Sequence, residues 1–309
     1  MRNKIILFLL VGIATANADI LNSTQRFLGQ SDPFSDYANG GSGKVDGLPV
    51  DEVPYSPADS DLGVQQVLAK REDVAPVTFN LSTAILRTDN AAGSNEPSWL
   101  TSTSAVAAWR PLLFDGWFGD VGVGADYLRF DDKAAADYEN YSGRLGIYKS
   151  FPDLDDTIFF VRYEYQFLSS GSVTNSDYNA QRIRAGVLKT LYVAPRQSIT
   201  AGVSGALEWS AHPKVIQRDE IEGNLTYRYA FTDNIYMLTS ARVSRFEYQD
   251  FGRDDWTYGL GIQLIWELTK NLQVSASISY DKNDSNSGVA TDEFQSWTGG
   301  LGIGCQWAF

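Results

Sequence analysis

The stretch Trp297-Thr-Gly-Gly-Leu-Gly-Ile-Gly-Cys-Gln-Trp-Ala-Phe309 decides the fold. Apolar residues recur at every second position, and the residues between them are small or polar. The apolar positions are Trp297, Leu301, Ile303, Cys305, Trp307 and Phe309. A period of two predicts a β-strand whose two faces meet different surroundings. Aromatic residues at both ends of the apolar face are typical of a strand with lipid on one side and a lumen on the other.

Similar runs precede this strand along the chain, each long enough for the roughly 9–11 residues that a tilted strand needs to cross a bilayer. With the closing strand they make twelve: 77–87, 100–111, 117–129, 139–150, 157–168, 179–192, 197–210, 219–231, 235–247, 255–268, 271–281 and 294–309. Connections after the even-numbered runs are mostly short, as at Ala194-Pro195 and Thr232-Asp233, whereas those after the odd-numbered runs are longer. This alternation predicts an all-β, transmembrane, antiparallel up-and-down β-barrel of twelve strands, with both barrel ends in the periplasm.

The faces of the runs sort in the same way. In run 255–268, large apolar side chains from Trp256 to Leu268 occupy one side, and Gln263 and Glu267 occupy the other. Lys149 and Lys189 interrupt the apolar face near predicted periplasmic ends. Either these lysines extend to the membrane surface, or the alternation slips after a bulge.

An outward apolar face sends a set of charged side chains into the lumen, because an Arg facing lipid at mid-depth would cost about 2–4 kcal/mol. These side chains are Arg144, Arg162, Glu164, Arg184, Glu208, Glu222, Arg242 and Glu267, together with Asp126. Two interpretations remain open. The charges could form a cross-strand network that strengthens the wall, or a constriction that orients solutes and sets ion selectivity.

The N-terminal region differs from the strand-like part. Arg2 and Lys4 precede an apolar run, and Ala16-Asn17-Ala18 supplies small residues, so 1–18 is predicted to be a cleaved signal peptide. Residues 19–75 are polar, acidic and predicted to be largely irregular. They could form a periplasmic leader, a lumenal plug or a dock for a periplasmic partner. Residues 76–309 form the predicted barrel.

The closing strand and the twelve runs resemble those of porin-like bacterial outer-membrane barrels, over Pro76 to Phe309, with no identifiable subfamily. Closing strands of that class carry a Gly followed, after two residues, by two aromatic residues one residue apart. Gly304, Trp307 and Phe309 match this pattern, whereas Gly302 stands where a polar residue is expected. The resemblance implies an outer-membrane location, recognition of this strand by the barrel-assembly machinery, and contact with outer-membrane lipid and lipopolysaccharide.

Composition excludes several other functions. The formal net charge of -13 argues against nucleic-acid binding, which favours a basic face. One Cys and one His provide no metal cluster, and phosphate-loop and dinucleotide motifs are missing, so no cofactor is expected. Asp281 to Gly288 offers oxygen ligands for calcium, but an Asx-rich hairpin loop accounts for it better.

Three functions remain. The favoured one is a narrow porin-like channel for small polar or charged solutes, without enzymatic activity. The second is a closed structural or surface-interaction barrel. The third is a lipid-modifying enzyme using His212, for which a single His beside abundant Ser residues is a poor signal. The sequence leaves the oligomeric state open.

Overall fold

The computed structural model describes residues 77–90, 96–114, 116–132, 137–151, 154, 157–169, 178–249, 252–287 and 293–309. The predicted signal peptide, 1–18, and the N-terminal segment, 19–75, lie outside these residues. Within them, no helix is long and apolar enough to cross a membrane.

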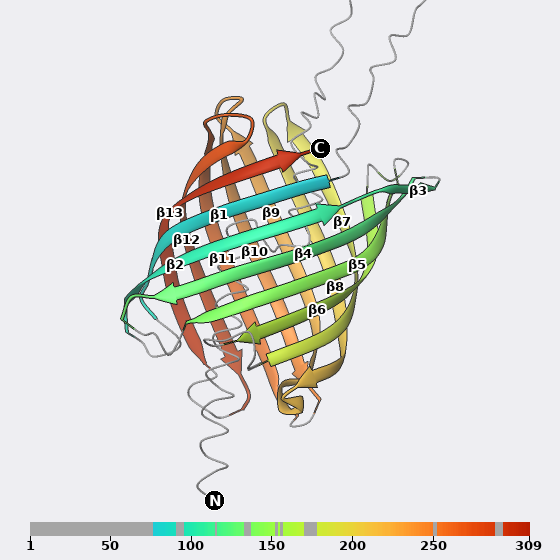
Figure 1. Ribbon diagram of the computed structural model, residues 1–309, viewed down its shortest axis with the longest axis vertical. Helices are drawn as coiled ribbons and strands as arrows, with labels where there is room; N and C mark the ends of the chain where they lie inside the picture. The colour runs from blue at the N-terminus through green and yellow to red at the C-terminus, as the bar shows by residue number, and fades with distance from the viewer. Residues whose placement is uncertain are drawn as a thin grey trace, which may run out of the picture.

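The described residues form β-strands with one short 3-10 helix (Figure 1). The elements are β1 Val77–Thr88, β2 Ser98–Trp109, β3 Leu112–Phe114, β4 Trp117–Phe130, β5 Tyr138–Phe151, β6 Thr157–Ser169, β7 Tyr178–Ala194, β8 Gln197–His212, η4 Lys214–Ile216, β9 Arg218–Ala230, β10 Ile235–Tyr248, β11 Asp254–Glu267, β12 Leu272–Ser285 and β13 Phe294–Ala308.

The strands close into a single antiparallel barrel. Apart from the short β3, each strand pairs with the next strand in the chain, β2 pairs with β4, and β1 pairs with β13 from Thr78↔Ala308 to Thr88↔Thr298. The short β3 follows β2 and pairs only with the start of β4, so twelve strands make the wall over the described residues. The predicted fold class is therefore confirmed, and the strand bounds differ from the predicted ones by a few residues at most.

One rim of the barrel, called here the turn rim, carries both ends of the wall. The Phe309 N–H donates to the Val77 carbonyl at 3.0 Å, and the Val77 N–H donates to the Phe309 carbonyl at 3.3 Å. Short turns join β7 to β8, β9 to β10 and β11 to β12 at the same rim. The opposite rim is called the loop rim. In an outer-membrane barrel the turn rim faces the periplasm.

The alternation of faces follows the sequence pattern. In β11, outward side chains such as Leu260 and Ile262 are 59% and 48% exposed, while the inward Thr257 and Gln263 are buried. The backbone hydrogen bonds are satisfied around the closed ring, so apolar side chains can face lipid without leaving an open strand edge.

Two details differ from the sequence prediction. β12 continues to Ser285, four residues beyond the predicted end, so Asp281 and Asp284 lie in a strand and not in a hairpin loop. The registers of β7 and β8 shift at Gln181/Arg182 and again at Tyr192/Ala194. Lys189 lies between these two shifts, where pairing is regular, so it faces outward with its apolar neighbours. Lys149 lies in the regular pairing of β4 with β5 and also faces outward.

Candidate functional site: the inner wall

A carboxylate on β6 joins three arginines inside the barrel. Glu164 Oε1 lies 2.6 Å from Arg162 Nε and 3.2 Å from Arg184 Nε, and Glu164 Oε2 lies 2.5 Å from Arg182 Nε. Strand register places Arg162 directly opposite Arg184, and Glu164 directly opposite Arg182. Like charges facing each other across two strands are destabilising, so Glu164 supplies the negative charge that this arrangement needs.

The network continues across the next strands toward the loop rim. Arg184, whose side chain is 1% exposed, donates to Glu220 Oε2 at 2.6 Å and to Ser204 Oγ at 3.1 Å. Ser244 on β10 donates to Glu222 at 3.2 Å. These contacts link five consecutive strands, β6 to β10, by side-chain hydrogen bonds.

A further group lies nearer the loop rim. Tyr178 donates to Glu208 Oε2 at 3.1 Å, and the Arg218 N–H donates to Glu208 Oε1 at 3.3 Å. The Arg218 guanidinium donates to Tyr248 at 2.9 Å and lies 4.0 Å from the centre of the Phe246 ring. Arg218 is thereby held by a hydrogen bond and a cation–π contact together.

The term charged sector is used here for the inward charges of β6 to β9: Arg162, Arg182, Arg184 and Arg218 with Glu164, Glu208, Glu220 and Glu222. Positive and negative side chains are equal in number in this set. All are buried or largely buried, and burial of unmatched charge is costly, so matching stabilises the arrangement.

Smaller ion pairs lie beside the charged sector. Arg144 donates to Asp120 at 3.1 Å, with its guanidinium over Gly122 of β4. Arg242 Nη2 lies 3.7 Å from Asp281 Oδ1 across Gly259, the residue that pairs with both on the intervening strand. A Cβ at Gly259 would lie 3.1 Å from the Asp281 carboxylate, so glycine leaves the space that this pair crosses.

The structure brings most of the sequence-predicted lumenal charges onto one side of the inner wall. Arg162, Glu164 and Arg184 share one network, while Glu208 and Glu222 occupy neighbouring positions in the charged sector. The remaining predicted residues lie apart: Arg144 and Arg242 in their own ion pairs, Glu267 at the turn-rim end of β11, and Asp126 accepting from Asn140 at 3.0 Å.

Sequence reasoning missed several partners. Arg182 and Glu220 lie two residues from Arg184 and Glu222, so strand alternation already places them on the inward face. Strand alternation likewise places Arg218, Asp120 and Asp281 on the inward face. The pairings themselves could not be deduced, because they depend on the register between strands.

A second sector of the inner wall, called here the small-residue sector, carries little side-chain bulk. It consists of small inward residues on β12, β13, β1 and β2, and longer inward side chains such as Gln273, Asn80 and Val106 lie nearer the turn rim on the same strands. Its members are Ser275, Ser277, Gly300, Gly302, Gly304, Ser82, Ala84, Ser102 and Ser104. A Cβ added at Gly302 would lie 3.1 Å from Ser275 Oγ and 3.4 Å from the Ala84 Cβ. The side chains that flank Gly302 are thus short, whereas Leu86 flanks Gly300 and Gln273 flanks Gly304.

Apolar side chains gather inside the barrel toward the loop rim. This loop-rim cluster combines residues from most of the wall with the β8–β9 loop: Ala84, Leu86, Leu100, Leu128, Phe130, Tyr138, Leu168, Tyr178, Ala180, Ile216, Phe246 and Tyr248. Ile216 comes from η4, which turns this loop inward. The polar inner face predicted from the sequence is therefore incomplete at this end.

Other candidates from the sequence remain isolated. His212 is the last residue of β8 and is exposed at the loop rim. Asp281 faces inward and Asp284 outward, so these two carboxylates cannot jointly bind one calcium ion as a loop would. Across the described part of the chain, no group of three or more His, Cys, Asp or Glu side chains could hold a metal ion.

Comparisons with known proteins agree with the barrel. The family described as "Putative beta-barrel porin 2" matches residues 218–307, which comprise β9 to most of β13. An outer membrane channel from Pseudomonas putida F1 superposes with a TM-score of 0.52 at 10% identity, covering 75% of this chain and 96% of that one. The chain has the fold of a porin-like outer-membrane β-barrel.

Two further structures match at lower TM-scores. The KdgM porin has a TM-score of 0.40 at 10% identity, covering 74% of this chain and 99% of that one. The translocator domain of the autotransporter NalP from Neisseria meningitidis has a TM-score of 0.42 at 13% identity, covering 75% and 88%. Comparison with curated proteins gives no match. The match to the Pseudomonas putida channel, at 10% identity, shows the fold alone.

Proposed function

We propose that the protein is a narrow outer-membrane channel for small polar or charged solutes, without enzymatic activity. The observation that carries this proposal is the division of the inner wall into two sectors. Bulky paired charges occupy β6 to β9, whereas Ser, Ala and Gly make up the small-residue sector on β12, β13, β1 and β2. A solute would move along the small-residue sector while facing the ordered charges opposite.

The charged sector would act on the solute through the electric field of its paired side chains, because its positive and negative charges are equal in number. Rows of fixed guanidinium and carboxylate groups orient a passing dipole or ion, as in other selective pores. Because the arginines of the Glu164 network are held by ion pairs at 2.5–3.2 Å, their positions would stay fixed while a solute passes.

Conductance in planar bilayers tests the channel. Purified full-length protein should give discrete conductance steps, and Gly302→Leu should lower the conductance because it adds bulk to the small-residue sector. The matched control is Ala276→Leu on the neighbouring strand, whose side chain faces outward and should leave conductance unchanged. Absence of conductance in the full-length protein, or equal effects of the two variants, would contradict the proposal.

A closed structural barrel is the second candidate, and the loop-rim cluster favours it. Apolar side chains that meet inside a pore exclude water and so block ions. Replacing Phe246 and Ile216 by Ser should then produce conductance that the unaltered protein lacks. If both proteins conduct equally, the loop-rim cluster does not close the lumen.

The remaining features of the proposal concern export and surroundings. Residues 1–18 would direct export and be removed, the barrel-assembly machinery would recognise Gly304, Trp307 and Phe309, and outer-membrane lipid and lipopolysaccharide would surround the wall. Trp307 packs against Phe79 of β1 with ring centres 5.6 Å apart, so this part of the predicted signal also contributes to barrel closure.

A further inference from the structure

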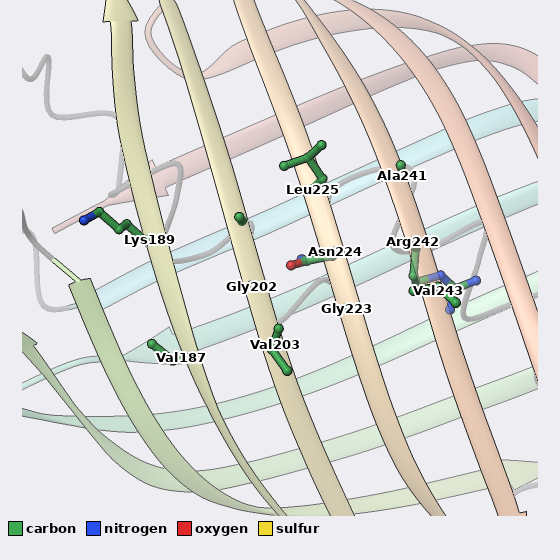
Figure 2. Close-up of a pocket in the computed structure, with 11 residues that line it drawn as sticks. Val187, Lys189, Gly202, Val203, Gly223, Asn224, Leu225, Ala241, Arg242 and Val243 are labelled. Carbon is green, nitrogen blue, oxygen red and sulfur yellow. The ribbon is translucent and has the colours of Figure 1, made fainter.

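The lipid-facing wall contains a depression that the channel proposal does not use. It has a volume of about 470 Å³ and spans the outer surface of β7, β8, β9 and β10 (Figure 2). Its floor is formed by small outward residues on three adjacent strands, Ala201, Gly223 and Ala241. A Cβ added at Gly223 would come no closer than 3.7 Å to Val243, so this part of the floor is open.

Apolar side chains surround the floor. Val187, Val203 and Val243 belong to the row of paired residues that contains Gly223. Leu225 belongs to the next row, which contains Ala201 and Ala241. Volumes of this order are typical of sites for small apolar ligands. A barrel wall facing lipid offers an acyl chain as the apolar occupant.

Lys189 adds a charge at one edge. It belongs to the same row as Ala201, Leu225 and Ala241 in the strand register, and Figure 2 shows it across the four strands from Ala241. The preceding residue, Leu188, pairs with Ile158, the second residue of β6 from the turn rim. The depression therefore begins near the turn rim at Lys189 and runs obliquely toward the middle of the wall.

We propose that this depression binds an anionic phospholipid, with one acyl chain in the depression and the headgroup phosphate at Lys189. The apolar part of the site points into the bilayer, and Lys189, the outward-facing cation among its lining residues, lies toward the membrane surface, as the two ends of such a lipid require. The other cation of the lining, Arg242, faces the lumen and Asp281. A lysine side chain has the length to reach the headgroup level while its methylene groups remain in contact with apolar surface.

Charge argues for a lipid over a second copy of this chain. In a two-fold dimer within a membrane, each residue near the axis meets its own copy at the same height. Lys189 would then approach a second Lys189 beside an apolar surface, which is repulsive. A lipid phosphate at that height has the opposite charge.

Lys149 provides a matched control. It is a second outward strand lysine near the turn rim, and its ammonium lies 5.5 Å from the centre of the Trp117 ring and 5.3 Å from that of Phe151. Lys149 thus rests on aromatic rings, without contributing to the depression. Its substitution changes the charge of the wall by the same amount and leaves the depression intact.

The experiment measures lipid bound to full-length protein by native mass spectrometry from mixed micelles. The probes are phosphatidylglycerol and phosphatidylcholine with identical acyl chains. We expect a preference for phosphatidylglycerol that Lys189→Gln lowers roughly fivefold, the effect of one lysine near an anionic membrane surface. Lys149→Gln should retain the preference.

Filling the depression tests the acyl-chain site separately. Ala241→Leu should reduce binding of both lipids, whereas the outward control Ala276→Leu should not. Gly223→Val provides a second filled variant should Ala241→Leu fail to fold, as judged by migration on gels before and after heating. Equal effects of Lys189→Gln and Lys149→Gln, or unchanged lipid binding in the folded filled variant, would overturn the proposal. Cross-linked dimers that disappear only in the filled variant, with lipid binding unchanged, would assign the surface to a second copy.

Discussion

Removal of the negative charge at Glu164 should destabilise the barrel more than removal of any exposed carboxylate. Glu164→Gln preserves the shape of the side chain but leaves Arg162, Arg182 and Arg184 around a neutral amide. Arg184 keeps its 2.6 Å contact with Glu220, and Arg182 lies 3.9 Å from the same carboxylate. Arg162 loses its 2.6 Å ion pair, so the loss is concentrated on one buried guanidinium.

The expected loss in free energy of unfolding follows from these kept and lost contacts. Removing one partner of a buried ion pair typically costs about 3–5 kcal/mol, and the retained contacts of Arg184 argue for the lower end. The control is Glu247→Gln on β10, an outward carboxylate that is 66% exposed and 3.5 Å from Arg245. An exposed pair of this kind contributes about 0–1 kcal/mol.

Denaturant titration of the folded barrel in lipid vesicles, followed by tryptophan fluorescence, measures both free energies of unfolding. The double variant Arg162→Gln/Glu164→Gln should recover part of the loss, because it removes both members of the pair whose charge was left unmatched. If Glu164→Gln costs no more than Glu247→Gln, the three arginines do not depend on this carboxylate and the account of the charged sector is wrong.

Two further predictions concern glycine and the closing strand. Gly186→Val should destabilise the barrel by roughly 1–3 kcal/mol by overpacking, since a Cβ there would lie 2.7 Å from the Phe160 ring and 2.8 Å from the Ser204 Cβ; Gly143→Ala, with open space at its Cβ, is the control in the same denaturant titration. Trp307→Ala should slow barrel formation in an assembly assay scored by migration on gels before and after heating, because it removes part of the predicted assembly signal and the contact with Phe79; folding at the rate of the unaltered protein would contradict that role.

The strands were predictable from the sequence because the two faces of each strand meet different environments. Leu260 and Gln263 of β11 lie on faces with different chemistry, and that difference repeats at every second residue. A shift of one residue in the predicted alternation would turn Arg162 and Glu164 toward lipid. Because charged side chains are disfavoured there, the sequence allows only one assignment of the two faces. The same pattern, however, describes each strand alone.

The inner wall was less predictable because its contacts are made between strands. Arg162 lies opposite Arg184, a pairing that depends on the stagger of β6 against β7 and is compensated by Glu164 from within β6. The loop-rim cluster was also missed. Leu128 and Leu168 occupy inward positions near the loop-rim ends of their strands, so they depart from a polar inner face without breaking the alternation.

The glycines of the wall differ in the side chains that lie beside them on the two sides of the barrel. Gly122 and Gly186 each lie beneath a long inward side chain from an adjacent strand: Arg144 and Phe160, respectively. A Cβ at either glycine would collide with that side chain, so these glycines allow bulk to lie flat across the wall. Gly302 lies beside the short side chains of Ser275 and Ala84, whereas Gly304 lies beside Gln273 and Ser82. The same residue type therefore has different consequences on the two sides of the barrel: it makes room for a bulky inward side chain at Gly122 and Gly186, and it keeps side-chain bulk low at Gly302.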